Sequence, residues 1–165
     1  MDSRSAGKFL KDKFPQAVLE IEEFRGETTV VLEATKLLEV MAFLKQNSEL
    51  SYDMLIDQTG VDFPDRPLRF SLSYLLHSMK FNNRIRVKTG VAQGVAVDTV
   101  SSIWRSADWM ERETAEMFGI VFKNHPNPKH ILLTDDFVGY PLRKDYDVKG
   151  PNFDQPFKVN LETEK

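Results

Sequence analysis

The sequence contains no cysteine among its 165 residues. This absence excludes disulfide bonds, and it excludes ligation of zinc or an iron–sulfur cluster by thiolates of this chain. The sequence also lacks an apolar run of the roughly 18 residues that a membrane-spanning helix needs. The first residues carry no apolar stretch of the kind found in signal peptides. We therefore expect membrane association to come only through partner proteins.

An excess of charge of one sign is also missing. Basic residues number 22 and acidic residues 25, so the formal net charge is -3 and gives no global attraction to nucleic acid. No P-loop, GxGxxG or GxSxG motif is present. Hydrophobic residues make up 41% and charged residues 28%, a composition typical of a soluble globular protein. The length suits one domain with a sizeable core.

The hydrophobic pattern predicts a two-layer α+β domain. Helical spacing covers residues 3–14, 35–46 and 101–118, and strand alternation covers 17–24, 27–34, 52–63, 67–77 and 83–92. We expect a hairpin turn at Arg25-Gly26, a break near Gly60, and two pieces in the last helix. The order α-β-β-α-β-β-β-α favours one mixed sheet with helices on one side.

From residue 123 onward, the periodicity is weak. Four prolines lie between residues 128 and 156, and five aromatic residues argue against a disordered tail. These aromatic residues are Phe137, Tyr140, Tyr146, Phe153 and Phe157. We therefore expect residues 1–122 to form the α+β domain, and residues 123–165 to form an extended His-Pro loop followed by a Pro-rich C-terminal docking segment.

The stretch "DWMERETAEMFGI" places two acids at positions 111 and 113 of a predicted helix. Side chains at i and i+2 point about 160° apart on a helix, so these two do not converge as a glycosidase-type pair. The helical wheel places Glu113 on an apolar arc with Trp109 and Met117. A carboxylate there needs a cationic partner, and we expect it to be the guanidinium of Arg143, with Arg105 or His125 as second choices.

The other charged residues of this helix have local explanations. Asp108 suits a helix cap, and Glu111 follows three residues later in capping-box spacing. Arg112 and Glu116 have the i, i+4 spacing of an exposed ion pair. Gly119 suits the helix stop.

Two alternatives arise in the segment that follows. His125 and His130, with Asp135 and Asp136 nearby, offer metal-ligand types, but their spacing matches no compact motif. Hydrogen-bonded histidines in an ordered loop are the simpler interpretation. The stretch "YPLRKDY" combines basic and aromatic residues, as in surfaces that stack nucleic-acid bases. It is short and the chain is acidic, so a docking segment or an internal ion pair is preferred.

The stretch "WMERETAEMFGIVFKNHPNPKHILL" resembles the signature of the C subunit of the proton-pumping NADH:quinone oxidoreductase, respiratory complex I, including its short chloroplast and cyanobacterial relatives. The positions that carry the resemblance are Glu111, Arg112, Glu113, Glu116, Met117, Phe118, Gly119, His125, Pro126, Lys129, Ile131 and Leu132. The likeness continues upstream in "IDQTGVDF", "RFSLSYLLHS" and "NRIRVKTGV", and downstream in "VGYPLRKDY". It therefore covers residues 52–146.

The resemblance implies a non-catalytic subunit of the peripheral arm that carries no cofactor. Iron–sulfur clusters, flavin and quinone are then expected in partner subunits, chiefly the large quinone-site subunit and the cluster-bearing subunits. The implied location is peripheral, on the cytoplasmic side of the cell inner membrane. The residues expected to have structural or interface roles are Glu111, Arg112, Glu113, Glu116, Phe118, Gly119, His125, Pro126, Lys129, Tyr140, Pro141, Leu142, Arg143, Lys144, Asp145 and Tyr146.

Two other functions stay open at this point. Related domains occur in membrane-bound hydrogenase and formate hydrogenlyase assemblies, and a free-standing metal-dependent enzyme would use the histidines and acids. The short C-terminal end also leaves the electron donor, NADH or ferredoxin, undecided.

Overall fold

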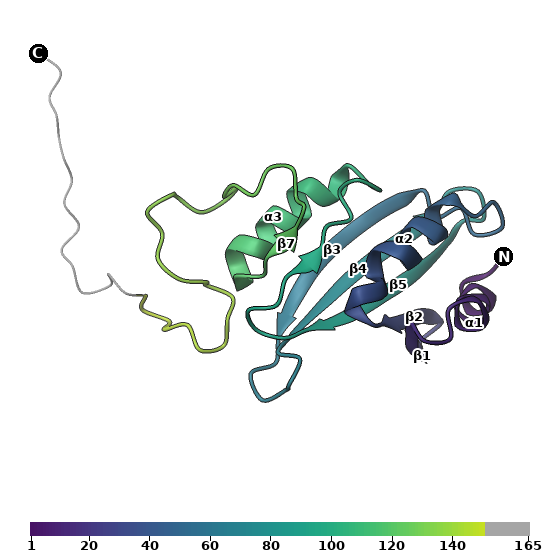
Figure 1. Ribbon diagram of the computed structural model, residues 1–165, viewed down its shortest axis with the longest axis horizontal. Coiled ribbons are helices and arrows are strands. Elements are labelled where there is room, and N and C mark those ends of the chain that lie inside the picture. Colours follow the sequence, from purple (N-terminus) through teal and green to yellow (C-terminus); the bar gives the residue numbers. More distant parts are fainter. Residues whose placement is uncertain (151–165) are drawn as a thin grey trace, which may run out of the picture.

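The computed structural model describes residues 1–150 of the chain. Its elements are α1 (Ser3–Lys13), β1 (Val18–Phe24), β2 (Glu27–Leu32), the 3-10 turn η1 (Ala34–Lys36), α2 (Leu37–Gln46), β3 (Met54–Asp62), β4 (Phe70–Ser78), β5 (Asn83–Val91), β6 (Val97–Asp98), α3 (Ser106–Phe118) and β7 (Phe122–Lys123) (Figure 1). The predicted order is confirmed, with the short strands β6 and β7 added. Residues 101–105 precede α3 as turns, so the expected two-piece helix is a single helix.

Five strands form one mixed sheet in the order β1-β2-β5-β4-β3. Neighbouring strands are antiparallel except β2 and β5, which are parallel. The β1–β2 hairpin turns at Arg25 and Gly26, whose φ angles of 50° and 81° are those that a tight two-residue hairpin turn requires. The mixed α+β sheet predicted from the sequence is therefore confirmed. β6 and β7 pair separately as a short parallel ribbon.

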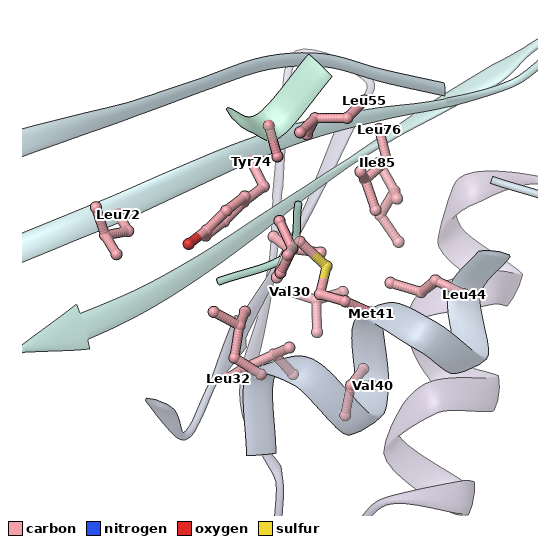
Figure 2. Close-up of a cluster of buried hydrophobic side chains, with 14 of the residues drawn as sticks. Val30, Leu32, Val40, Met41, Leu44, Leu55, Leu72, Tyr74, Leu76 and Ile85 are labelled. Carbon is pink, nitrogen blue, oxygen red and sulfur yellow. The ribbon is translucent and has the colours of Figure 1, made fainter. Parts of the chain in front are cut away.

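One face of the sheet is buried under the helices. Alternate residues of β4 are buried from Phe70 to Ser78, which is the period-two pattern of a strand covered on one side. The core gathers side chains of β2, β4 and β5 against α2, including Val30, Tyr74, Ile85 and Met41 (Figure 2). The strand predicted over residues 67–77 begins only at Phe70, and Leu68, which precedes it, is exposed.

α3 covers the same face at the β3 edge of the sheet. The Thr114 hydroxyl donates a hydrogen bond of 2.9 Å to the Gln58 side chain of β3. β3 runs through Gly60 without the predicted break, and the glycine has a packing role instead. A Cβ at this position would lie 3.0 Å from the Phe118 ring, so the missing side chain lets α3 approach the strand.

Beyond β7, residues 124–150 contain no helix or strand and lie beside α3, past the end of the sheet (Figure 1). We call residues 124–133 the His-Pro loop and residues 134–150 the terminal loop. The part of the Pro-rich docking segment predicted beyond residue 150, with Phe153 and Phe157, lies outside the described residues. Within residues 1–150, no helix has both the length and the hydropathy needed to cross a bilayer.

Candidate functional site

α3 buries a different face from the one predicted. Glu113 is exposed, and Trp109 is 60% exposed. The buried residues of the helix are Ala107, Glu111, Thr114, Glu116 and Phe118. The prediction of a buried Glu113 is therefore wrong. It assumed that the most hydrophobic side chains mark the buried face, whereas this helix turns small and polar groups toward β3 and the loops around it.

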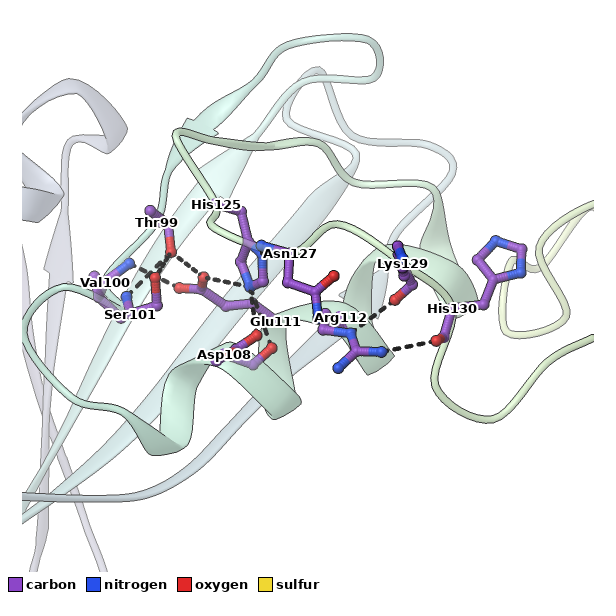
Figure 3. A network of polar contacts seen from close by, with 10 residues as sticks. All are labelled: Thr99, Val100, Ser101, Asp108, Glu111, Arg112, His125, Asn127, Lys129 and His130. Carbon is purple, nitrogen blue, oxygen red and sulfur yellow. Dashed lines mark hydrogen bonds and ion pairs between the residues drawn. The ribbon is translucent and has the colours of Figure 1, made fainter. Parts of the chain in front are cut away.

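Glu111 is the acid that lies in the interior, with no exposed surface. Its carboxylate accepts hydrogen bonds from the Thr99 hydroxyl and from the Val100 backbone N–H, the latter at 2.8 Å (Figure 3). It is not a capping-box residue, because α3 begins at Ser106, two residues before the predicted cap. Burial raises the pKa of Glu111 to about 7, against the lowering effect of the two hydrogen bonds.

His125 joins the His-Pro loop to the start of α3. Its Nδ1 accepts a 3.1 Å hydrogen bond from the Asn127 backbone N–H, so the ring proton is on Nε2. Nε2 lies 3.1 Å from the backbone oxygen of Asp108, to which it donates. The hydrogen-bonded role expected for this histidine is confirmed. Among the described residues, no group of three or more histidine and acidic side chains is arranged to hold a metal ion.

Arg112 and Glu116 hold the His-Pro loop through its backbone. Arg112 donates to the carbonyl oxygens of Lys129 and His130, both at 2.8 Å. Glu116, which is buried, accepts from three successive backbone N–H groups, those of residues 131, 132 and 133, at 2.9, 2.9 and 3.3 Å. The predicted exposed ion pair between the two side chains is wrong. Each one instead satisfies backbone groups that the irregular loop leaves unpaired.

Arg143 attaches the terminal loop to the C-terminal end of α3. Its Nε donates to the Phe118 carbonyl oxygen at 2.6 Å, and its guanidinium lies 4.2 Å from the centre of the Tyr140 ring. A cation is favourable at these orphan helix carbonyls. Arg143 is therefore not the partner of Glu113. Gly119 ends the helix as predicted, at φ 69°, and a Cβ there would clash with the Arg143 guanidinium.

A second attachment of the terminal loop involves an ion pair that the sequence analysis did not identify. Arg69 and Asp62 form a two-point pair at 2.7 and 2.9 Å, and both side chains are almost fully buried. Asp145 contacts the same guanidinium at 2.8 Å, and the Lys144 backbone N–H donates to Asp62 at 2.8 Å. The Arg69 guanidinium holds the pKa of Asp62 below its usual value. The available signal was the alternation along β3, which places Asp62 on the buried face with Gln58 and Gly60.

The remaining predicted residues lie along the outer side of these loops. Pro126, Lys129, Tyr140 and Leu142 are exposed, and Pro141 and Tyr146 are half-buried. The Tyr146 ring stacks on Phe137 with 6.2 Å between ring centres. The described part of the C-terminal region is thus an ordered layer, with polar contacts to the domain on its inner side and apolar side chains facing outward.

Comparison with known proteins identifies relatives along most of the chain. Residues 30–152 match the family model described as respiratory-chain NADH dehydrogenase, 30 Kd subunit. The C subunit of the NADH-quinone oxidoreductase of Geobacter metallireducens is 45% identical over 154 residues, with 92% of this chain and 93% of that protein covered. The corresponding C subunit of Geotalea uraniireducens is 42% identical over 153 residues, covering 92% of each.

Two solved structures share the fold. The trypsin-resistant fragment of Nqo5 has a TM-score of 0.64 and 31% sequence identity, over 75% of this chain and 98% of that one. A chain of the membrane-bound sulfane sulfur reductase, an archaeal respiratory membrane complex, has a TM-score of 0.76 over 98% of both chains. Its sequence identity is 22%, so this second likeness concerns the fold alone.

Proposed function

Because this chain belongs to the family of the 30 Kd subunit of respiratory-chain NADH dehydrogenase, we propose that it is a non-catalytic peripheral-arm subunit of a proton-translocating NADH:quinone oxidoreductase. Its task is to present a preformed surface on which other subunits assemble. The chemistry of NADH oxidation and quinone reduction belongs to the complex as a whole.

The observation that carries this proposal is the set of exposed apolar side chains along α3, the connection from α3 to β7, and the two loops. Large hydrophobic side chains that are exposed here are Trp109, Val121, Leu132, Phe137, Val138, Tyr140, Leu142 and Val148, which together we call the docking surface. Apolar surface gathered in one region of a soluble domain is typical of a protein–protein interface, whereas isolated exposed hydrophobic residues are not. Tryptophan and tyrosine are the residue types that most often anchor such interfaces.

The same contacts explain why irregular loops can present a defined surface. Glu116 and Arg112 bind backbone groups of the His-Pro loop, and Arg143 of the terminal loop binds the Phe118 carbonyl oxygen of α3. These contacts lie on the inner side of the loops, and the side chains of Leu132 and Leu142 remain exposed. A surface that is ordered before binding loses less conformational entropy when a partner docks. The acids of the helix thus have structural roles: they position the surface that the partner covers.

The partners we propose are the large quinone-site subunit and the cluster-bearing subunits of the peripheral arm. Iron–sulfur clusters, flavin and quinone are assigned to those subunits, in keeping with a chain that has no cysteine. We propose that this chain, as part of the complex, lies at the periphery of the cell inner membrane on its cytoplasmic side. Within the chain, residues 1–122 serve as the scaffold and residues 123–165 as the docking segment. The names of the relatives support this assignment over a hydrogenase-type assembly or a free-standing enzyme.

Replacing two residues of the docking surface tests the proposal. Leu132→Asp combined with Leu142→Asp should lower the yield of the assembled complex by at least roughly tenfold, because two anchoring contacts are each worth about 1 kcal/mol or more. The measurement is co-purification of the other subunits with a tagged copy of this chain, together with NADH:quinone reductase activity of the membranes.

A matched control separates docking from folding. Phe24→Asp alters a residue that is also exposed but lies on the β1–β2 hairpin, away from the docking surface. It should leave the yield unchanged, and the unfolding free energy of both purified variants should stay within about 0.5 kcal/mol of the original chain, as for other surface substitutions. A double variant that still recovers the whole complex would contradict the proposal.

A further inference from the structure

Three titratable groups, Glu111, Asp108 and His125, meet where α3 packs against the His-Pro loop. A cavity of about 240 Å³ lies beside them, and Glu111 and His125 line it. The Glu111 carboxylate lies 3.8 Å from His125 Nε2, and the Asp108 carboxylate lies 3.5 Å from the same atom (Figure 3). The structural role of the docking surface does not require this arrangement.

The cluster lacks a permanent cation. His125 accepts the Asn127 N–H at Nδ1, so the ring is neutral with its one proton on Nε2. Arg112 is bound to two loop carbonyl oxygens, and Glu116 to three loop N–H groups. The buried Glu111 carboxylate and the partly exposed Asp108 carboxylate therefore face one imidazole. Such an arrangement favours one bound proton over two free negative charges.

A chain of hydroxyl groups allows that proton to be bound without moving any heavy atom. The Thr99 hydroxyl contacts the Glu111 carboxylate on one side and the Ser101 hydroxyl on the other, the latter at 2.8 Å. When Glu111 is ionised, Thr99 donates to it. When Glu111 is protonated, it donates to Thr99, which then donates to Ser101. Ser101 is half-buried, so this chain reaches the surface.

We propose that Glu111, Asp108 and His125 form a proton-binding site that couples the attachment of the His-Pro loop to pH. With one proton on Glu111, the neutral histidine keeps its bond to Asn127. With Glu111 ionised, the buried charge has no cationic partner, and opening of the His-Pro loop returns water to it. Opening separates His125 from the Asn127 N–H, so the loop attachment weakens when the proton leaves Glu111.

The direction of the pH effect follows from the surroundings of Glu111. Burial and the nearby Asp108 raise the pKa of Glu111 to about 7, and the Tyr74 hydroxyl, which faces it from β4, is itself neutral because burial raises its pKa. When the loop opens, water returns and the pKa of Glu111 falls toward 4.5. The closed loop therefore binds the proton more tightly than the open loop. Closure is favoured at the acidic end of this range and weakens as pH rises toward about 7.

The test uses the full chain, labelled for NMR, between pH 5 and pH 8. The side-chain carboxyl carbon of Glu111 should titrate near pH 7. The protection factor of the Asn127 amide against hydrogen exchange, corrected for intrinsic exchange, should fall at least about tenfold between pH 5.5 and 7.5. Glu111→Gln should abolish this fall, and Glu113→Gln should leave it unchanged.

A second variant keeps the proposal testable if Glu111→Gln does not fold. Thr99→Val removes the hydroxyl that stabilises the ionised carboxylate, so the Glu111 titration should move to higher pH. The proposal is overturned if Glu111 of the original chain titrates near pH 4.5, or if the protection of the Asn127 amide does not depend on pH. Either result would leave the proposed assembly function intact, because Glu111, Asp108 and His125 are not part of the docking surface.

Discussion

Asp62→Ala will destabilise the protein by about 3–5 kcal/mol, because the substitution leaves the buried guanidinium of Arg69 without its two-point partner. It also removes the acceptor of the Lys144 N–H, one of the contacts that attach the terminal loop, while the contact between Asp145 and Arg69 remains. Denaturant unfolding of the purified chain, followed by circular dichroism, measures the change as a shift of midpoint at constant slope.

The surface pair between Arg86 and Glu27 is the matched control. Its atoms approach as closely, 2.7 Å, but Glu27 is largely exposed, so Glu27→Ala should cost less than about 1 kcal/mol. Similar costs for Asp62→Ala and Glu27→Ala would contradict the assignment of the buried pair as an anchor. The low pKa of Asp62 adds a pH signature: the stability that the pair contributes is present above the unfolded-state pKa and is lost as pH falls through the lower folded-state value.

Glu116→Ala is expected to release the His-Pro loop and to prevent most of the complex from assembling. The carboxylate is the partner of three successive backbone N–H groups, and hydrogen bonds to a charged acceptor contribute about 1.5–3 kcal/mol each. Leu132 of the docking surface lies within this stretch, so the surface itself loses its position. We expect the yield of the complex to fall by more than about tenfold.

Two measurements detect the loss of the His-Pro loop's attachment to α3. Trypsin cleavage after Lys129 reports opening of the loop in the free protein, and co-purification reports assembly. Glu113→Ala is the control, since this acid lies three residues away on the same helix but is exposed and should change neither. If Glu113→Ala impairs folding or assembly as strongly as Glu116→Ala, the roles assigned to the two acids are wrong.

The strands and the first two helices could be predicted from hydrophobic period alone. The alternation from Phe70 to Leu76 predicted the buried face of β4, and the pair Arg25-Gly26 predicted the turn of the β1–β2 hairpin. These features depend on near neighbours in the sequence, which is why local patterns are sufficient. The family could also be predicted, because its signature lies in one continuous stretch of α3 and the His-Pro loop.

The roles of the acids could not be predicted, because each depends on a contact that is distant in sequence or made with backbone atoms. Glu116 binds N–H groups fifteen to seventeen residues away, and Asp62 binds the Lys144 N–H 82 residues away. A helical wheel ranks side chains by hydrophobicity and contains no information about unpaired backbone groups. It therefore selected Glu113. In the structure the buried acids are Glu116, whose carboxylate accepts hydrogen bonds from loop N–H groups, and Glu111, whose carboxylate accepts one from the Thr99 hydroxyl.

Carbene footprinting of the free protein and of the purified complex tests directly whether partners cover the docking surface. We expect labelling of Trp109, Leu132 and Leu142 to fall at least about fivefold on assembly, because residues at the core of an interface lose most of their solvent contact. Phe24, exposed on the β1–β2 hairpin, should be labelled equally in both states. Equal labelling of Trp109, Leu132 and Leu142 in the free and assembled forms would contradict a docking role for α3 and the two loops.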